Sequence, residues 1–268
     1  MPRDSSRGIV AFNCENSCGH TNVGTTVRAM ATTFEDAWQA ASGVEGWLLP
    51  AQGKALFEAG RRLLPGTVAV EIGSHRGKSA ILIASGLQGD SRLTAVDPFD
   101  DPRWGGGPES LEKFTANIEA AGVASRIDLF RGISSEASAQ WDGTPVGLLW
   151  VDGAHDLEST LADFDGWLPY MAPGSEIYVH DAFSAIGTTK AIMQRFFWSS
   201  HVHYTGCERT LVKFQVRPTT FSERVVSALG VCSRLPFFAR MLAIKLARRK
   251  GMKSLERKLM REDNEPLI

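Results

Sequence analysis

Short apolar runs alternate with segments of helical periodicity through the middle of the chain. Apolar runs of strand length occur at 67–72, 92–97, 127–130, 147–152 and 175–180. Segments typical of helices follow them, near 78–87, 109–121, 135–140, 157–168 and 188–198. This alternation predicts βαβ units, and hence an α/β fold whose mainly parallel, doubly wound sheet is covered by helices on both faces.

The pattern changes on either side of this region. Phe34 to Leu64 carries apolar residues at helical spacing, broken at Pro50, which predicts two helices packed before the sheet. After the last helix, the runs His201–Tyr204 and Leu211–Val216 are separated by a stretch that contains Gly206. This separation predicts an antiparallel hairpin at an edge of the sheet.

The same patterns divide the chain into four parts. Residues 1–32 are rich in Ser, Thr, Asn and Gly and predict a flexible or loosely docked arm, and residues 33–218 form the α/β domain. Residues 219–262 predict basic amphipathic helices divided by Pro236. Residues 263–268 are expected to form a frayed tail.

Charge is distributed unevenly along the chain. The net charge of −1 argues against a nucleic-acid partner. Between Arg224 and Arg261, however, there are eleven Lys or Arg residues and one acid, Glu256. Such a segment could lie on an anionic membrane surface. It could instead pack on its own body or on a second subunit of a homo-oligomer, and the sequence leaves both interpretations open.

The cysteines and the N-terminus indicate the expected compartment. A chain of 268 residues with four cysteines does not require a disulfide framework, and Cys14, Cys18 and His20 lack the spacing of a standard zinc site. The first residues lack the apolar core of a signal peptide, and no stretch of about 18 apolar residues is evident. We therefore expect a cytoplasmic enzyme, with peripheral contact to the inner membrane face through 219–262 as the alternative.

The loop after the first strand, in the stretch VEIGSHRGKSA, decides the class of cofactor. Gly77-Lys78-Ser79 is similar to the end of a phosphate-binding P-loop, and GLLWVDGAHD is similar to a Walker B strand. Only three residues separate Gly73 from Gly77, however, where a P-loop has four. Glu71 at the strand end would also repel a triphosphate. A P-loop-like nucleotide-binding protein is therefore the alternative rather than the preferred hypothesis.

The preferred cofactor is S-adenosylmethionine (SAM), which carries no phosphate. Asp97 ends the second strand, where an acid in a βαβ unit accepts hydrogen bonds from a ribose diol. Glu71 would favour the sulfonium and ammonium groups of SAM, and Gly73 would allow the backbone to approach it closely.

Residues of about 67–216 resemble the class I SAM-dependent methyltransferases, in the branch of macrolide-sugar O-methyltransferases and cephalosporin-hydroxylase-like proteins. The stretches that carry the resemblance are VEIGSHRGKSA, AVDPF and LLWVDGAHDLESTLADFDGWLPYMAPGSEIYVHD. It implies a Rossmann-like seven-stranded sheet with an antiparallel last strand, and Gly132, Ile133 and Ser134 near the adenine. The expected cofactor-binding residues are then Glu71, Gly73, Ser74, Gly77, Asp97, Gly132, Ile133, Ser134 and Asp152.

A second group of polar residues follows the fourth and fifth strands, namely Asp152, His155, His180 and Asp181. Because ligands bind beyond the carboxyl ends of parallel strands, we expect these side chains to converge. His155 would act as a general base. Asp152, His180 and Asp181 would hold Mg²⁺, as the resemblance implies, or Mn²⁺, because His180 stands where an acid is common in that branch.

Simpler interpretations of this group remain. Asp152 or Asp156 could cap the helix that begins near Leu157, and His155 could be an ordinary turn histidine. The sequence thus predicts a SAM-dependent O-methyltransferase acting on a hydroxyl of a small molecule, a sugar or a glycan. The alternatives are nucleotide binding, or a methyltransferase fold with non-methyl chemistry or no catalysis.

Overall fold

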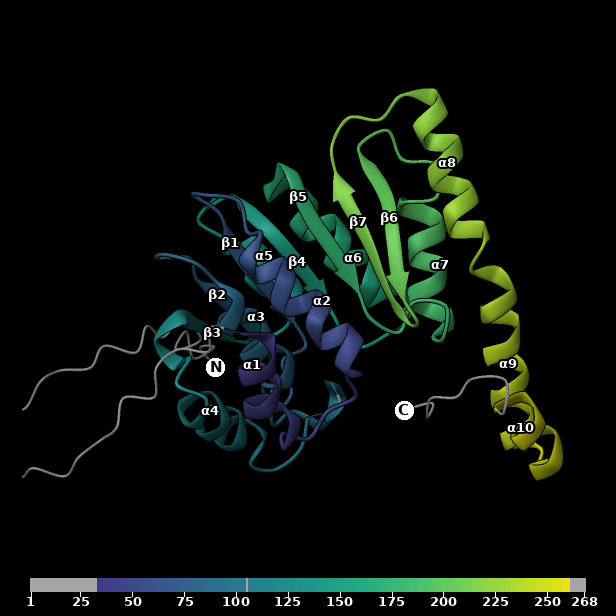
Figure 1. Ribbon diagram of the computed structural model, residues 1–268, viewed down its shortest axis with the longest axis horizontal. Helices are drawn as coiled ribbons and strands as arrows, with labels where there is room; N and C mark the ends of the chain where they lie inside the picture. The colour runs from purple at the N-terminus through teal and green to yellow at the C-terminus, as the bar shows by residue number, and fades with distance from the viewer. Residues whose placement is uncertain (1–32, 105, 261–268) are drawn as a thin grey trace, which may run out of the picture.

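The computed structural model describes residues 33–104 and 106–260, and it shows a seven-stranded sheet between two layers of helices (Figure 1). The strand order is β3-β2-β1-β4-β5-β7-β6. The predicted arm 1–32 and tail 263–268, including Cys14, Cys18 and His20, lie outside the described residues. The strands are β1 (Val68–Ile72), β2 (Leu93–Asp97), β3 (Ile127–Arg131), β4 (Val146–Val151), β5 (Met171–Val179), β6 (Val202–Glu208) and β7 (Leu211–Val216).

The pairing of the strands confirms the predicted Rossmann-like sheet. Strands β3, β2, β1, β4 and β5 are parallel, so their carboxyl ends meet at one edge. Strand β7 runs antiparallel to both β5 and β6. The chain winds outward from β1 through β2 to β3, and then returns to place β4 on the other side of β1. This reversal marks a position beyond the carboxyl ends of β1 and β4 at which ligands bind in such sheets.

The helices of the α/β domain lie where the periodicity predicts them. Pro50 begins the second helix, where its missing N–H costs no hydrogen bond. The helices are α1 (Phe34–Ser42), α2 (Pro50–Arg61), α3 (Lys78–Gly86), α4 (Ser110–Ala120), α5 (Ser134–Ala139), α6 (Leu157–Trp167) and α7 (Ile186–Arg195), with short 3₁₀ turns at Pro102–Trp104, Ala124–Arg126 and Leu168–Tyr170.

Alternating strand residues form a separate core on each face of the sheet. Ala69, Ala95 and Trp150 pack with residues of α1 to α4. Their neighbours in sequence, such as Val70 and Leu149, pack with residues of α5 to α8. Because both faces are buried, the central strands are almost uniformly apolar, as expected of a doubly wound sheet.

The hairpin at the sheet edge differs in detail from the prediction. Strand β6 continues to Glu208, so the connection to β7 is only Arg209-Thr210 rather than a longer loop. The register of the pair shifts between Tyr204 and Gly206. Gly206 (φ 147°) therefore accommodates an irregularity within the strand instead of ending it.

Residues 221–260, here called the C-terminal arm, form three helices, of which the first lies beside β6 and the other two extend beyond the sheet (Figure 1). These are α8 (Phe221–Cys232), α9 (Leu235–Arg249) and α10 (Lys253–Met260). Pro236 lies in the first turn of α9 and separates two helices as predicted, whereas the third helix after Gly251 was not expected. By length and composition alone, Phe221–Arg249 is apolar enough to cross a membrane, which corrects the expectation that no such stretch exists.

Candidate active site

A cavity of about 830 Å³ opens at the carboxyl ends of β1 to β4, at the point where the strand order reverses. Its volume suits a small-molecule cofactor with part of an acceptor. His155 lines the cavity. Seven of the nine expected cofactor-binding residues also line it, namely Gly73, Ser74, Asp97, Gly132, Ile133, Ser134 and Asp152. Glu71 and Gly77 do not.

The loop between β1 and α3 needs its two glycines for different reasons. Gly73 has a φ of 86°, and a Cβ atom there would lie 2.2 Å from the carbonyl oxygen of Asp152. Gly77 has a φ of 89° at the start of α3, and a Cβ there would contact Phe114 and Ile118. Gly73 thus allows the ends of β1 and β4 to come together beneath the cavity, and Gly77 makes the left-handed turn into α3.

Asp97 shapes the loop with its side chain. Its Oδ2 accepts hydrogen bonds from the backbone N–H groups of Ser74 and His75, both at 2.8 Å, and its Oδ1 accepts one from Phe99. Burial raises the pKa of Asp97, although these three amides oppose the shift. The residue expected to bind a ribose therefore also holds the loop in place at the cavity wall.

Glu71 lies behind the cavity wall rather than on it. The side chain is completely buried, and neither carboxylate oxygen has a hydrogen-bond partner. Burial raises the pKa of Glu71 to about 8, against the effect of the nearby Ser74 and Ser79 hydroxyls. The sequence predicted direct contact between Glu71 and the cofactor, but the buried position of Glu71 gives that contact no support. Ser74, whose buried hydroxyl has no partner, lines the cavity instead.

The position of Lys78 argues against a P-loop. Its Nζ donates to the carbonyl oxygen of Gly46 at 3.2 Å and lies 5.8 Å from the centre of the Trp38 ring. A P-loop lysine must reach the terminal phosphates of a nucleotide. The ammonium of Lys78 instead ties the start of α3 to the segment between α1 and α2.

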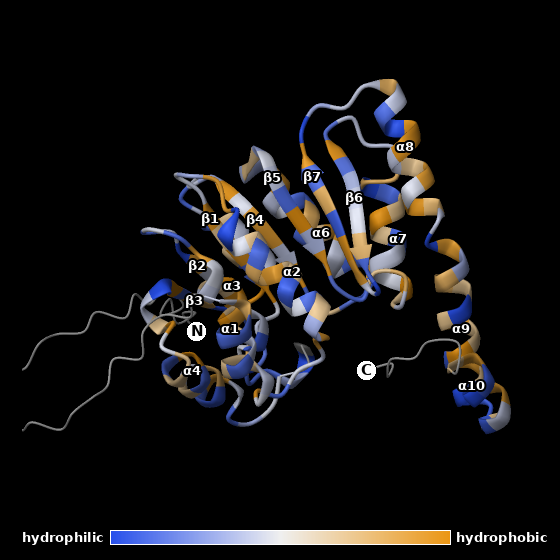
Figure 2. Ribbon diagram, in the orientation of Figure 1, coloured by the Kyte–Doolittle hydropathy of each residue, from blue (hydrophilic) through white to orange (hydrophobic). Residues whose placement is uncertain are grey.

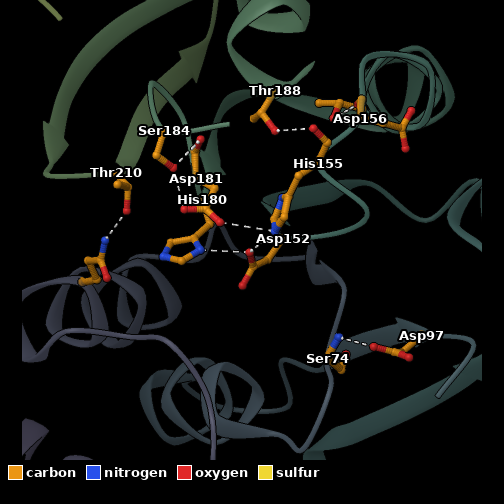
Figure 3. Close-up of polar contacts among 12 residues, drawn as sticks. Ser74, Asp97, Asp152, His155, Asp156, His180, Asp181, Ser184, Thr188 and Thr210 are labelled. Atoms are coloured by element: carbon orange, nitrogen blue, oxygen red, sulfur yellow. Dashed lines mark hydrogen bonds and ion pairs between the residues drawn. The ribbon is translucent and has the colours of Figure 1, made fainter. Parts of the chain in front are cut away.

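The four polar residues that follow β4 and β5 converge beside the cavity (Figure 3). Nδ1 of His180 lies 2.9 Å from Oδ1 of Asp152. Nε2 of His155 lies 3.7 Å from the same oxygen and 3.4 Å from Oδ2 of Asp181. Ser184 orients Asp181 by donating its hydroxyl hydrogen to Oδ1 at 2.7 Å. His155 thus stands between two carboxylates, with its Nε2 beyond good hydrogen-bond distance from either.

Backbone conformation places two members of this cluster. His155 has a φ of 60° and Asp181 a φ of 49°, in the left-handed region that non-glycine residues seldom adopt. Such conformations cost free energy and persist where the surrounding structure enforces them, often at functional sites. Asp156 caps α6 by accepting from the Ser159 N–H at 2.9 Å, so Asp152 is left for the cluster.

Asp152 and His180 form an ion pair. Burial alone would raise the pKa of Asp152, but the charge and hydrogen bond of His180, with the charges of His155 and His75, hold it below its usual value. Burial would lower the pKa of His180, but Asp152 and Asp181 raise it. Both shifts favour a carboxylate facing an imidazolium. The pairing therefore stabilises the ionised form of Asp152 at the cavity wall.

The donor set as arranged does not fit a divalent metal ion. Among residues 33–104 and 106–260, no three His, Cys, Asp or Glu side chains are grouped as metal ligands. Nδ1 of His180 is already engaged by Asp152, and the His155 imidazole occupies the space between the two carboxylates. The metal site predicted for Asp152, His180 and Asp181 therefore has no support in the arrangement of the described residues.

Two residues at the cavity were not singled out from the sequence. His75, in the β1–α3 loop, packs against Trp47 with ring centres 5.5 Å apart. Asp163 lines the cavity from the buried side of α6, and burial raises its pKa to about 7 despite the nearby Ser134 hydroxyl. Asp163 falls on the buried face of α6, beside Phe164 and Trp167. An acidic residue on the apolar face of a helix is the sequence signal that could have identified it.

Known proteins share both the local sequence and the fold. Residues 70–182 match a family described as a methyltransferase domain. An uncharacterized protein of Sinorhizobium fredii, y4gI, is 31% identical over 117 residues, which are 42% of this chain and 13% of that protein. The chain therefore corresponds to a small part of this curated relative.

Two solved structures show the same fold. One is the SAH-bound methyltransferase PaMTH1 of Podospora anserina, with a TM-score of 0.53 and 12% identity over 69% of this chain and 87% of that one. The other is the O-methyltransferase TomG of Streptomyces achromogenes, involved in tomaymycin synthesis and solved with SAM, with a TM-score of 0.50 and 20% identity over 70% and 89%. Residues 70–182 are thus similar to a methyltransferase domain, and the chain around them has the Rossmann-like fold that these two solved methyltransferases share.

Proposed function

We propose that this protein is a SAM-dependent O-methyltransferase that uses His155 as a general base and acts on a hydroxyl of a sugar or glycan. The observation that carries the proposal is the position of His155. Its Nε2 stands between the carboxylates of Asp152 and Asp181 at the wall of the cavity beyond the carboxyl ends of β1 and β4.

The cavity fits the expected cofactor. Its lining includes the acids Asp97, Asp152 and Asp163, which suit the sulfonium and ammonium groups of SAM. The Lys and Arg side chains of its lining have partners in the protein: Arg76 pairs with Glu45, Arg103 pairs with Asp101, and Lys78 bonds Gly46. The unpartnered Ser74 hydroxyl and the ribose-suited Asp97 would hold the cofactor from the β1–β2 side.

SAM, when bound, supplies a methyl group on a sulfonium, with a neutral thioether as the leaving group. The protein must align an acceptor oxygen with that methyl and remove its proton as the new bond forms. Nε2 of His155 would take the proton, and the carboxylates of Asp152 and Asp181 would stabilise the resulting imidazolium. His180 keeps Asp152 ionised for this purpose.

The sugar or glycan acceptor rests on the resemblance of the Asp152-Gly153-Ala154-His155 stretch to the sugar O-methyltransferase branch. TomG, the fold neighbour in tomaymycin synthesis, shows that this fold carries O-methylation in at least one protein, at 20% identity. The nucleotide-binding alternative has no comparable support, because the Lys78 ammonium is bonded to Gly46 and the loop is one residue shorter than a P-loop.

The test combines binding with product analysis. The purified protein is titrated calorimetrically with S-adenosylhomocysteine (SAH) and with ATP, and then incubated with SAM and a panel of glycans for mass spectrometry. We expect SAH binding, no ATP binding, and a mass gain of one methyl group that His155→Gln abolishes. Binding of ATP without SAH would refute the cofactor assignment. Binding of SAH with full activity in His155→Gln would refute the proposed base.

A further inference from the structure

The C-terminal arm, residues 221–260, exposes more apolar surface than any other segment of the described chain. Seven of the ten large hydrophobic side chains that are exposed in residues 33–104 and 106–260 lie on it: Phe221, Val226, Leu229, Leu235, Leu246, Met252 and Leu255. Phe221 is 71% exposed, Leu229 65% and Leu246 53%. A concentration of this kind on a water-facing surface indicates an interaction site.

Four of these side chains, two on α8 and two on α9, follow the helical repeat on the outward faces of these helices. Val226 and Leu229 are one turn apart, on the face of α8 opposite the buried Ala228 and Val231. Leu235, Leu242 and Leu246 recur on α9, opposite the buried Ile244 and Ala247. Figure 2 shows hydrophobic and hydrophilic residues interleaved along both helices. The apolar stripe therefore faces away from the protein's own core.

The arm packs against the rest of the protein through specific contacts, and these contacts determine which of its faces is exposed. Ser227 Oγ accepts the backbone N–H of Tyr204 at 2.9 Å, and Gly230 fits against the Tyr204 ring. On α9, Nζ of Lys245 donates to the carbonyl oxygen of Ser184 at 2.6 Å, and Phe238 packs against Phe183. These contacts also connect the arm to the loop that carries Asp181.

The charges on the arm favour an anionic partner. Residues 221–260 contain ten Lys or Arg residues and only two acids, Glu223 and Glu256. Glu223 pairs with Arg217 and caps α8, and Glu256 pairs with Arg248. The exposed basic residues gather at the end of α9 and on α10, with Arg249 and Lys250 adjacent to the apolar stripe. Basic side chains flanking an apolar helix face are typical of surfaces that lie on anionic bilayers.

Two aromatic side chains are also exposed at the start of α8. The rings of Trp198 and Phe221 are in edge contact, with their centres 5.8 Å apart, and both are exposed. Aromatic residues, and tryptophan in particular, prefer the boundary between acyl chains and headgroups. We propose that the C-terminal arm docks the protein peripherally on an anionic lipid bilayer, with its apolar stripe in the interface and its basic residues among the headgroups.

Two other occupants of this surface are less consistent with the structure. Packing of one arm on the arm of a second copy would bring two strongly basic segments together. A membrane span over Phe221–Arg249 would place Arg234 and Arg240 within the hydrocarbon and would detach α8 from β6 and α9 from the Ser184 loop. Peripheral docking buries the apolar stripe and leaves these contacts intact.

The proposal is tested by sedimentation of the full chain with vesicles of phosphatidylcholine alone, or with phosphatidylglycerol added. Two double variants remove one feature each: Leu229→Glu/Leu246→Glu for the apolar stripe, and Arg249→Glu/Lys250→Glu for the charge. The control, Lys54→Glu/Lys190→Glu, makes the same change in net charge at exposed positions on α2 and α7. SAH binding and thermal unfolding confirm that each variant is folded.

We expect binding to the anionic vesicles that weakens as salt rises, and little binding to phosphatidylcholine. Each arm variant should reduce partitioning about tenfold or more, whereas the control should change it less than about twofold. Equal binding to both vesicles, or no binding at low salt, would overturn the proposal. So would retention in the membrane after a high-pH carbonate wash, which indicates a span, or a dimer in solution that Leu229→Glu/Leu246→Glu dissociates.

Discussion

The two sides of the cavity are built in different ways. On the β1–β2 side the backbone shapes the site: Gly73 allows close packing of the strand ends, and Asp97 holds the loop through three amides. On the β4–β5 side the side chains of Asp152, His155, His180 and Asp181 interact with one another. Changes on the first side should therefore affect folding and cofactor binding, and changes on the second should affect the rate of reaction.

The largest expected effect comes from the second side. His155→Gln removes the proposed base while preserving a polar side chain, so kcat should fall about 100- to 10,000-fold. The dissociation constant for SAH, measured by calorimetry, should change less than about threefold because the cofactor residues are untouched. His201→Gln, at an exposed histidine next to β6, is the control. If His155→Gln weakened SAH binding as much as it lowered kcat, the β4–β5 side would not be specific to the rate of reaction.

Gly73→Ala tests the first side. The added Cβ would meet the Asp152 carbonyl oxygen at 2.2 Å in a left-handed conformation, and we expect a loss of about 2–4 kcal/mol in the free energy of unfolding. Gly89→Ala is a matched control, because Gly89 has a φ of 54° but no atom within 4 Å of its added Cβ. Denaturant titration should show the smaller loss there, about 1 kcal/mol. Equal losses would mean that the backbone angle, and not the approach of β4, requires glycine at position 73.

The buried carboxyl of Asp163 at the cavity should make the stability of the protein depend on pH. Its pKa in the folded protein, about 7, lies above the ordinary 3.8, because burial disfavours the charged form. The folded state therefore binds this proton more tightly than the unfolded state, and its contribution to stability falls as pH rises from about 4 to 7. Asp163→Asn should reduce the fall in stability with pH, to which the buried Glu71 also contributes, and should stabilise the protein by about 1–4 kcal/mol at pH 8.

Urea titrations between pH 4 and 8 would measure the slope, with Asp90→Asn, at an exposed turn, as the control. An unchanged slope in Asp163→Asn would show that the buried carboxyl is not the source of the pH dependence.

The smallest expected effect is that of metal removal. Since the carboxylates are occupied by histidines and no described residues form a metal-ligand group, EDTA treatment should change methyl transfer less than about twofold. The rate is measured with and without added Mg²⁺ or Mn²⁺. A large loss of methyl transfer after EDTA treatment, restored by either ion, would show that Asp152, His180 and Asp181 bind a metal. The β4–β5 side of the cavity would then differ from the β1–β2 side in binding a metal as well.

Much of the fold could be predicted because periodicity is a local property. Burial on both faces favours apolar strands such as Val146–Val151, and proline within a helical pattern favours the first turn of a helix, as at Pro50. The convergence of Asp152 with Asp181 followed from the rule that parallel strands end at one edge. The length of β6 was missed because Gly206 indicates a turn and a strand irregularity equally well.

The sequence by itself determined the order of elements, the glycine loop and the polar residues at the strand ends, because these depend on spacing along the chain. Only the tertiary structure decided what each group faces. Glu71 lies behind the cavity wall, His155 stands between two carboxylates, and Asp163 is a buried acid at the cavity. It also decided that the apolar stripe of the arm faces outward, since the direction of a helix face depends on which side the body covers.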